Sequence, residues 1–322
     1  MTIFFYMASS TSFTFTSASD FYKKIFGVKT YKISLDSACT CPNRDGSLST
    51  GGCIFCSAGG SGEFSSSAIL PIKMQVKKAI ELIEKKAYGR RGKENINSEK
   101  EPVFIAYFQN FTSTYGNQEL LQKKYIEALS CSQVKGLALA TRPDCLSDSM
   151  IDFLTVLSKK FFVQIEFGLQ TSNNLTAKKI NRCYKSSVYT KIMKKLHNKA
   201  PDIHVVSHII FGLPGETEKD MINSVKFALK NGTSGIKFTV LYVLKNTPLE
   251  KLYTAGNFKC LKMEEYFELL VKALKIIPQN IVIHRLTGDG PKKLLIAPEW
   301  TKNKRNVLNK LNSYLKLKLQ NN

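Results

Sequence analysis

The chain has 322 residues, 43% of them hydrophobic, which is enough to bury the core of one barrel-sized domain. Its 47 Lys and Arg against 25 Asp and Glu give a formal net charge of +22, which favours a polyanionic partner such as nucleic acid but also fits a lysine-biased, soluble protein. The eight cysteines are too sparse for the disulfide framework of a small secreted protein, and no apolar run approaches the length that spans a membrane.

Residues 1–20 are rich in Ser, Thr and Phe, and no Lys or Arg precedes Lys23. The segment therefore lacks both the basic start of a signal peptide and the arginines of a transit peptide. We interpret it as a loose N-terminal extension, with Met7 as an alternative first residue, and we expect the protein to reside in the cytoplasm.

Short apolar strands alternate with helices along most of the chain. Strands are predicted at residues 31–35, 103–108, 136–140, 162–167, 204–210 and 236–243. Helices are predicted between them at residues 68–86, 117–129, 147–158, 173–180, 188–198 and 216–230, with a polar surface connection at 88–101. This alternation indicates an α/β fold with a parallel sheet, which we place in one domain at residues 21–260.

A C-terminal α/β extension is expected at residues 261–322, with a helix at 263–276, a strand at 280–283 and a basic helix at 301–319. From Pro291 to Asn322 there are eight Lys or Arg and a single acid, Glu299. A basic helix of this kind either binds a phosphate backbone or forms a solvated surface.

Four of the eight cysteines lie within eighteen residues on a glycine-rich loop at 36–64: Cys39, Cys41, Cys53 and Cys56. Clustered thiolates suit zinc or an iron–sulfur cluster. All four sulfurs together would form a closed zinc site, whereas Cys41, Cys53 and Cys56 alone would hold a cluster with one open iron. The C-x-C spacing of Cys39 and Cys41 differs from the C-x2–4-C pairs of most zinc sites and so argues against zinc.

Three cysteines after the first strand, ending in C-x-aromatic-C at Phe55, resemble the motif of radical S-adenosylmethionine (SAM) enzymes. Most such enzymes have C-x3-C-x2-C, whereas here eleven residues separate Cys41 from Cys53. With the segments CPNRDG and GGCIFCSAGGSGEF, this spacing resembles the bacterial YhcC/YtqA-type radical SAM family, which is related to the radical SAM domain of the Elongator catalytic subunit. The resemblance extends from Tyr31 to the C-terminus.

This resemblance implies a partial (β/α)6 TIM-like barrel with a C-terminal α/β extension. It implies that Cys41, Cys53 and Cys56 hold a [4Fe–4S] cluster, that Cys39 is extra, and that SAM chelates the fourth iron. An external electron donor such as flavodoxin or ferredoxin would then reduce the cluster, and SAM would be cleaved to methionine and a 5′-deoxyadenosyl radical.

Site residues in such barrels follow the carboxyl ends of the strands. Gln109 and Asn110 occupy the place of a Gly-Gly-Glu-like turn that holds the SAM amino group in most radical SAM enzymes; turn chemistry is the alternative. Arg142, in an Elongator-type Thr-Arg-Pro-Asp segment, is expected to hold a carboxylate or phosphate bidentately, unless it forms a structural pair with Asp144.

Gln170 and Arg182 each lie in a segment that resembles the oxygen-independent coproporphyrinogen oxidase branch, where these segments contact SAM. The resemblance implies that Gln170 binds the ribose or the amino acid part of SAM and that Arg182 pairs with the SAM carboxylate. Glu166 faces the same rim, or serves as a salt-bridge partner at the edge of the core. His208 precedes the family's Gly-Leu-Pro-Gly-Glu-Thr turn and is expected to contact the ribose; a satisfied core histidine is the alternative.

In the C-terminal extension, His284, Arg285 and Asp289 are expected to line the open mouth of the barrel as substrate residues. The Elongator-type motif, the net charge and the basic tail together favour tRNA as the substrate, modified at the side chain of a wobble uridine. Two alternatives remain. One is a radical SAM enzyme that acts on a small metabolite or a protein, and the other is a non-enzymatic, zinc-binding, nucleic-acid-associated protein. No membrane partner is expected.

Overall fold

The computed structural model of the chain describes residues 15–60, 62, 65, 67–88 and 101–320. Residues 1–14 of the expected N-terminal extension and most of the expected polar connection at 88–101 lie outside the described residues. Within the described part of the chain, no helix is both long and apolar enough to cross a membrane.

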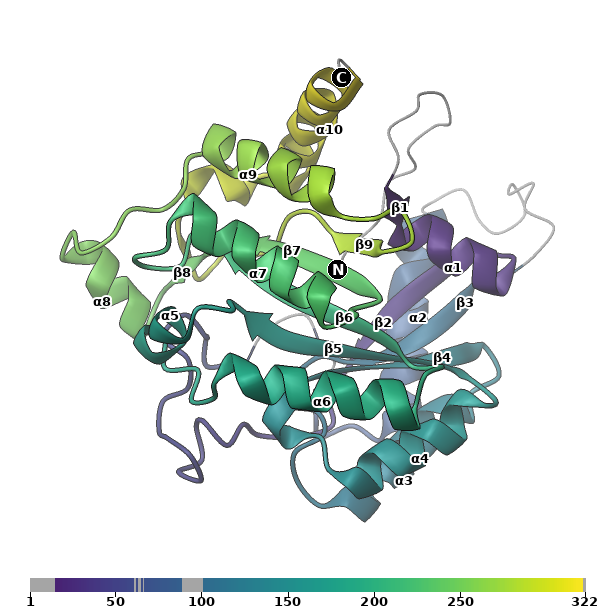
Figure 1. The fold of residues 1–322 in the computed structure, drawn as a ribbon. Coiled ribbons are helices and arrows are strands. Elements are labelled where there is room, and N and C mark those ends of the chain that lie inside the picture. Colours follow the sequence, from purple (N-terminus) through teal and green to yellow (C-terminus); the bar gives the residue numbers. More distant parts are fainter. Residues whose placement is uncertain (1–14, 61, 63–64, 66, 89–100, 321–322) are drawn as a thin grey trace.

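Eight parallel strands form one curved sheet that does not close on itself, a half-barrel (Figure 1). The strand order is β1-β9-β7-β6-β5-β4-β3-β2. All six predicted strands are present, as β2 (Thr30–Leu35), β3 (Val103–Phe108), β4 (Val134–Thr141), β5 (Phe162–Gln170), β6 (His204–Phe211) and β7 (Gly235–Val240). The α/β class and the parallel sheet predicted from the alternation of elements are therefore confirmed.

Two more strands come from segments that were expected to lie outside the barrel. β9 (Val282–Arg285), expected in the C-terminal extension and two residues earlier, pairs in parallel with β7 and places Val282 beside Gly235. β1 (Thr16–Ser17) pairs in parallel with β9, although these residues were expected to be loose. Segments from both ends of the chain therefore complete one edge of the sheet.

Helices cover the outer face of the sheet (Figure 1): α2 (Ile72–Tyr88), α3 (Gln118–Leu129), α4 (Asp148–Ser158), α6 (Ser186–Lys199), α7 (Glu218–Lys230) and α9 (Met263–Ile276). Several begin at side chains that cap them; at the start of α4, for example, the Ser147 hydroxyl accepts from the Met150 N–H. The main hydrophobic core lies between these helices and the sheet. α10 (Lys304–Gln320), the predicted basic helix, buries Val307, Leu311 and Leu315 against that core.

One end of the half-barrel is closed by α1 (Ala18–Phe26). Ala18 and Tyr22 on this helix pack against inward-facing residues such as Ile105 and Ala138. The other end, where the strands reach their carboxyl termini, carries the cysteine loop, α5 (Asn174–Lys179), α8 (Pro248–Thr254) and a small two-stranded antiparallel sheet of β8 (Val243–Leu244) with β10 (Leu295–Ala297). The barrel interior opens toward this second end.

Candidate active site

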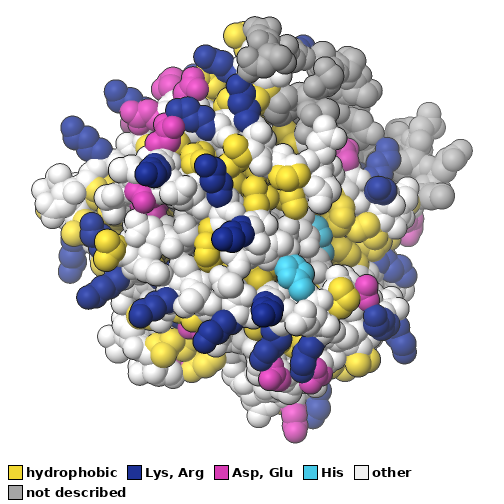
Figure 2. Space-filling model, viewed as in Figure 1, with side chains coloured by type: hydrophobic (Ala, Val, Ile, Leu, Met, Phe, Trp, Pro, Cys, Tyr) yellow, Lys and Arg dark blue, Asp and Glu magenta, His cyan; other side chains and the backbone are white. Residues whose placement is uncertain are grey.

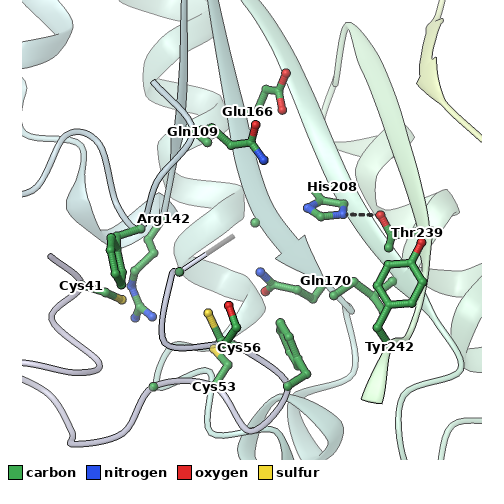
Figure 3. A pocket seen from close by; sticks show the side chains of 18 of the residues that line it. Cys41, Cys53, Cys56, Gln109, Arg142, Glu166, Gln170, His208, Thr239 and Tyr242 are labelled. Carbon is green, nitrogen blue, oxygen red and sulfur yellow. Dashed lines mark hydrogen bonds between the residues drawn. The ribbon is translucent and has the colours of Figure 1, made fainter. Parts of the chain in front are cut away.

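A cavity of about 250 Å³ lies at the carboxyl ends of the strands, where the barrel argument placed the site. The three predicted cluster cysteines and every predicted SAM-contacting residue line it; these are Cys41, Cys53, Cys56, Gln109, Arg142, Glu166, Gln170, Arg182 and His208. Figure 3 shows the sulfurs at one side of this space and His208 at the other. Arg285 and Asp289 also line the cavity, whereas His284 does not.

The cysteine loop is held against the segment that follows β5. Asn43 donates through its side-chain amide to the Asn181 carbonyl, and Asn181 in turn donates to the Gly52 carbonyl at 2.9 Å. The Ile54 N–H donates to the Ile180 carbonyl at 3.1 Å. These reciprocal bonds position Cys53 in the cavity wall, and the Asn43 amide also lies 3.6 Å from the Cys53 sulfur.

Arg44 closes the same loop from inside. Its guanidinium donates to the carbonyl oxygens of Cys56 and Ser57. Gly52 has a φ of +82°, and a Cβ there would meet the Arg44 Nε at 2.7 Å. A glycine is therefore required at this position, both for the left-handed backbone and for the close approach of Arg44.

The three cavity thiols influence one another electrostatically. The pKa of Cys53 is raised to about 12, first by burial and then by Cys56 and Cys41, with Arg142 acting in the opposite direction. Holding all three as thiolates therefore needs added positive charge. Iron supplies such charge, and Cys thiolates are its usual ligands in iron–sulfur clusters. The donor set thus fits the group that the sequence predicted.

Cys39 lies apart from the other three. Its sulfur accepts a hydrogen bond from the Ser37 hydroxyl, and its thiol donates one to the Ser113 carbonyl. The Cys39 side chain also packs against the main core. A single zinc ion would bring four sulfurs to about 3.8 Å from one another, because the Zn–S bond is about 2.3 Å long. Within the described ranges, no three Cys, His, Asp or Glu side chains are gathered to hold a single metal ion.

Gln170 is aimed into the cavity by an unusual backbone. It has a φ of +55°, ends β5, and lies between the cysteines and His208 (Figure 3). A Cβ on Gly168 would come within 2.4 Å of the Gln170 Nε2. The absence of a side chain at Gly168 therefore leaves the space that the Gln170 side chain occupies. Gln109 also reaches the cavity, and it accepts a hydrogen bond from the Ser34 hydroxyl at 3.0 Å. Both amides remain candidates for SAM contacts.

Asn110, in contrast, is used inside the protein. It contacts Asp36 and Ser65 through its side-chain amide and ties the cysteine loop to β3. These partners lie 45 and 74 residues away in the chain, so the Asn110 side chain links distant segments rather than making the local bond of a turn.

Arg182 occupies a different role from the one predicted. It is fully buried, and all five of its N–H groups point at protein acceptors: the carbonyls of Leu169, Thr171 and Tyr184 and the hydroxyl of Ser186. No N–H group is left for a SAM carboxylate. Its guanidinium instead holds the backbone on both sides of Gln170, which explains how that residue keeps its positive φ.

Arg142 adopts the geometry of the structural alternative. Its Nε and Nη2 donate to the two carboxylate oxygens of Asp144 at 2.9 and 2.7 Å, and its Nη1 donates to the Arg182 carbonyl at 3.0 Å. Burial alone would lower the pKa of Arg142, but Asp144 outweighs burial and raises it. Arg142 is therefore a fixed positive charge beside the thiols.

Glu166 lies inside the barrel in a network of ion pairs and hydrogen bonds that the sequence motifs did not predict. Lys32 at 2.5 Å and Lys237 at 2.7 Å donate to its two oxygens, and the Tyr107 hydroxyl adds a bond of 2.7 Å. Burial would raise the pKa of Glu166, but Lys237 and Lys32 hold it well below its usual range. The salt-bridge alternative thus accounts for both of its oxygens.

One sequence signal for this network was available. Lys32, Glu166 and Lys237 each lie within a predicted strand, where successive side chains point to opposite faces of the sheet. Charged side chains at such inward positions of a barrel indicate an internal network rather than a surface.

The prediction that His284 lines the mouth is wrong. His284 is buried at the closed end of the barrel, where its Nε2 lies 2.8 Å from the His204 Nε2 and its Nδ1 lies 3.4 Å from the Tyr22 hydroxyl. β9 begins later than expected, so His284 faces the barrel interior one layer below the cavity. Arg285 and Asp289 do reach the cavity, and Asp289 pairs there with Lys304 at 2.8 Å.

Family models match nearly all of the chain from Cys41 onward. The model of the radical SAM superfamily matches residues 41–228, and that of the Radical_SAM C-terminal domain matches residues 233–317. This protein belongs to the radical SAM superfamily. Membership makes it an enzyme whose cofactors are SAM and a [4Fe–4S] cluster, as the cysteine motif predicted.

Two curated proteins resemble this chain, one along most of its length and the other over little more than a third of it. The uncharacterized protein YtqA of Bacillus subtilis is 38% identical over 290 residues, which cover 90% of this chain and 86% of YtqA. The tRNA-2-methylthio-N(6)-dimethylallyladenosine synthase of Clostridium perfringens is 30% identical over 126 residues, 38% of this chain and 28% of that protein.

Among solved structures, the archaeal Elp3 of Methanocaldococcus infernus has the same fold. The match has a TM-score of 0.63 at 17% identity and covers 90% of this chain and 63% of that one. The predicted resemblances to the YtqA-type family and to the Elongator-type radical SAM domain are thereby confirmed.

Proposed function

We propose that Cys41, Cys53 and Cys56 hold the [4Fe–4S] cluster. We further propose that the enzyme modifies tRNA at a base, and that the site of modification is the side chain of a wobble uridine. The observation that supports the cluster assignment best is that these three thiols line one cavity at the open end of the half-barrel, while Cys39 does not. An external donor such as flavodoxin or ferredoxin would supply the electron, and the cytoplasm is the expected compartment.

When bound, the cluster and SAM supply a one-electron cleavage that yields methionine and a 5′-deoxyadenosyl radical able to remove a hydrogen atom from the substrate. The chain's own residues position and shield this chemistry. The amides of Gln109 and Gln170 offer donors and acceptors to bound SAM, and Arg182 fixes the backbone that aims Gln170. Arg142 adds a positive charge beside the three sulfurs.

Three observations favour tRNA. One relative is named as a tRNA-modifying synthase, and the solved structure with the same fold is an Elp3. The net charge is +22, and Lys and Arg side chains are spread over the face in Figure 2 among few acidic ones. Exposed Lys292 and Lys293 directly follow Pro291, which lines the cavity, so positive charge flanks its mouth.

The decisive test is chemical. Nucleoside digests of bulk tRNA from a deletion strain and from its parent are compared by mass spectrometry. The deletion strain is expected to lack one modified wobble-uridine nucleoside or to accumulate its precursor. Complementation with the wild-type gene should restore the profile, and complementation with the Cys53→Ala variant should not. Identical nucleoside profiles in deletion and parent strains would reject tRNA and leave a small metabolite or a protein as the substrate.

Binding provides a second prediction. Affinity for tRNA should fall steeply with salt, because bound phosphates release their counterions. The Lys292→Gln/Lys293→Gln variant should flatten the slope of log K against log salt concentration by about 0.7–0.9 for each phosphate that the two lysines neutralise in the wild type. Fluorescence anisotropy at several salt concentrations measures this slope.

The matched control is Lys23→Gln/Lys24→Gln. It removes the same charge from exposed positions on α1, which closes the opposite end of the barrel. Equal slopes for the two variants would show that tRNA binds through overall charge and not at the cavity mouth.

A further inference from the structure

Positive charge exceeds negative charge around the cavity. Its lining contains five cationic residues, Arg44, Arg142, Arg182, Lys237 and Arg285, and two acids, Glu166 and Asp289. The first three cations are engaged by backbone carbonyls or by Asp144. Lys237 and Arg285 lie together on neighbouring strands β7 and β9, on the side that holds His208 and Thr239.

Among the described residues, Arg285 donates hydrogen bonds only to uncharged groups. Its guanidinium contacts the Thr239 hydroxyl, the His208 ring at 3.3 Å and the Phe238 carbonyl at 3.4 Å. The nearby acid Asp289 pairs instead with Lys304, and no described carboxylate forms an ion pair with Arg285. An arginine in a cavity wall without an acid suits a bound anion, since its planar fork matches a carboxylate or phosphate.

Hydrogen-bond directions make His208 a donor toward the same space. Arg285 has only N–H groups, and its Nη2 lies next to the Thr239 hydroxyl and 3.3 Å from the His208 Nε2, so both atoms accept from it. With Nε2 as an acceptor, the Thr239 hydroxyl donates its own hydrogen to it over 2.7 Å. Burial, followed by Arg285 and Lys237, lowers the pKa of His208 well below its usual range, so the ring is neutral. With Nε2 accepting, the hydrogen lies on Nδ1, which faces the middle of the cavity (Figure 3).

Lys237 contributes the remaining charge. It donates to Glu166 at 2.7 Å and to the Tyr107 hydroxyl at 3.0 Å, which leaves one of its three N–H groups. Glu166 is shared with Lys32, so two ammonium groups face one carboxylate. Burial, opposed by Glu166 and assisted by Arg285 and Lys32, lowers the pKa of Lys237 to about 8. An additional anion here would offset this surplus of positive charge.

We propose that Arg285, His208 and Lys237 form a subsite for the oxyanion of a small co-substrate, a carboxylate or a phosphate monoester, on the cavity wall opposite the thiols. The subsite goes beyond the proposed function and does not depend on tRNA. A phosphate within an RNA backbone is an unsuitable occupant, because sugars flank it on both sides and the Lys237 side chain is only 13% exposed inside the barrel.

The test uses the full chain with its cluster reconstituted under anaerobic conditions and with SAM present. Acetate and methyl phosphate are the two probes, and titration by saturation-transfer NMR of their methyl protons gives a Kd for each. Wild type is expected to bind one of them, and which one it prefers distinguishes a carboxylate from a phosphate. Arg285→Gln should weaken that binding about tenfold or more, since it removes a hydrogen bond to a charged group.

Lys219→Gln is the matched control, because it removes the same charge from an exposed position at the start of α7 and should bind the probe as wild type does. SAM binding by Arg285→Gln, measured in the same samples, reports whether the variant is folded. If it is not, Thr239→Val serves instead, and it should weaken probe binding several-fold because His208 then loses the partner that sets its tautomer.

Several results would overturn the subsite. These are no binding of either probe to wild type, wild-type affinity in the folded Arg285→Gln or in Thr239→Val, and equal losses in Arg285→Gln and Lys219→Gln. Probe binding that appears only when SAM is omitted would assign the cations to the SAM carboxylate, and displacement by tRNA would assign them to RNA phosphate. All of these are binding measurements, so their failure is separate from a negative nucleoside comparison.

Discussion

Cys53→Ala, like Cys41→Ala and Cys56→Ala, is expected to lose the visible charge-transfer absorbance that the wild type gains on anaerobic reconstitution with iron and sulfide. Each change removes one of the three thiols in the cavity wall. Two remaining thiols leave a second iron without a protein ligand, and iron–sulfur clusters are held by Cys thiolates. Bound iron and acid-labile sulfide per chain, measured beside the spectrum, should fall to background.

Cys39→Ala is the matched control, since it removes a thiol from the same loop and should retain the full spectrum. Its sulfur contacts Ser37 and Ser113 rather than the cavity. Loss of iron in Cys39→Ala, with iron retained in Cys41→Ala, would contradict the ligand assignment. Zinc bound by all four thiols in the purified protein would contradict it as well.

The second large effect is expected on stability. Glu166→Gln should lower the free energy of unfolding by about 3–5 kcal/mol, because it leaves two buried ammonium groups without a countercharge. Glu166 is 3% exposed, and Lys32 and Lys237 bind opposite oxygens of its carboxylate. Urea denaturation followed by circular dichroism measures the change.

Glu218→Gln is the matched control for Glu166→Gln, because it breaks an ion pair on the surface instead of one inside the barrel. Glu218 pairs with Lys272 at 2.7 Å, but both side chains are about half exposed, at 55% and 48%. Solvent screens such a pair, so the loss of stability should stay within about 0–1 kcal/mol. Similar losses in the two variants would mean that the internal network contributes no more than a surface ion pair.

Glu166→Gln should also change how the free energy of unfolding depends on pH in acid. The pKa of Glu166 is lower in the folded protein than in the unfolded chain, so its contribution is fully present above the unfolded value of about 4.3 and is lost as pH falls through the folded value. Wild type should therefore lose stability more steeply than Glu166→Gln below about pH 4. Parallel curves for the two proteins would show that Glu166 is not held in its charged form.

Local patterns in the sequence were sufficient for the central strands and the helices that cover them, and for placing the three proposed cluster ligands close together. The order of strands and helices follows from apolar spacing, which reflects only whether a residue faces the core. Cys41, Cys53 and Cys56 lie within sixteen residues of one another on one glycine-rich loop, so their proximity needed no knowledge of the rest of the chain. The residues at the strand ends converge because parallel strands end at one edge.

Which partner each polar side chain meets was decided by contacts between distant segments. Arg182 was expected to bind SAM, but its donors are taken by the backbone after β5. Glu166 meets lysines 134 and 71 residues away in the chain. A motif names a residue type and a position, whereas the partner depends on which strands the fold brings side by side.

The strand β9 shows the same division. The sequence by itself predicts a strand at residues 280–283, but pairing with β7 places β9 at Val282–Arg285 and makes it part of the barrel. That pairing places His284 at the closed end beside His204 and brings Arg285 to the cavity beside His208 and Thr239. Because a shift of one residue in register turns every side chain of a strand to the opposite face, these roles depend on the tertiary structure alone.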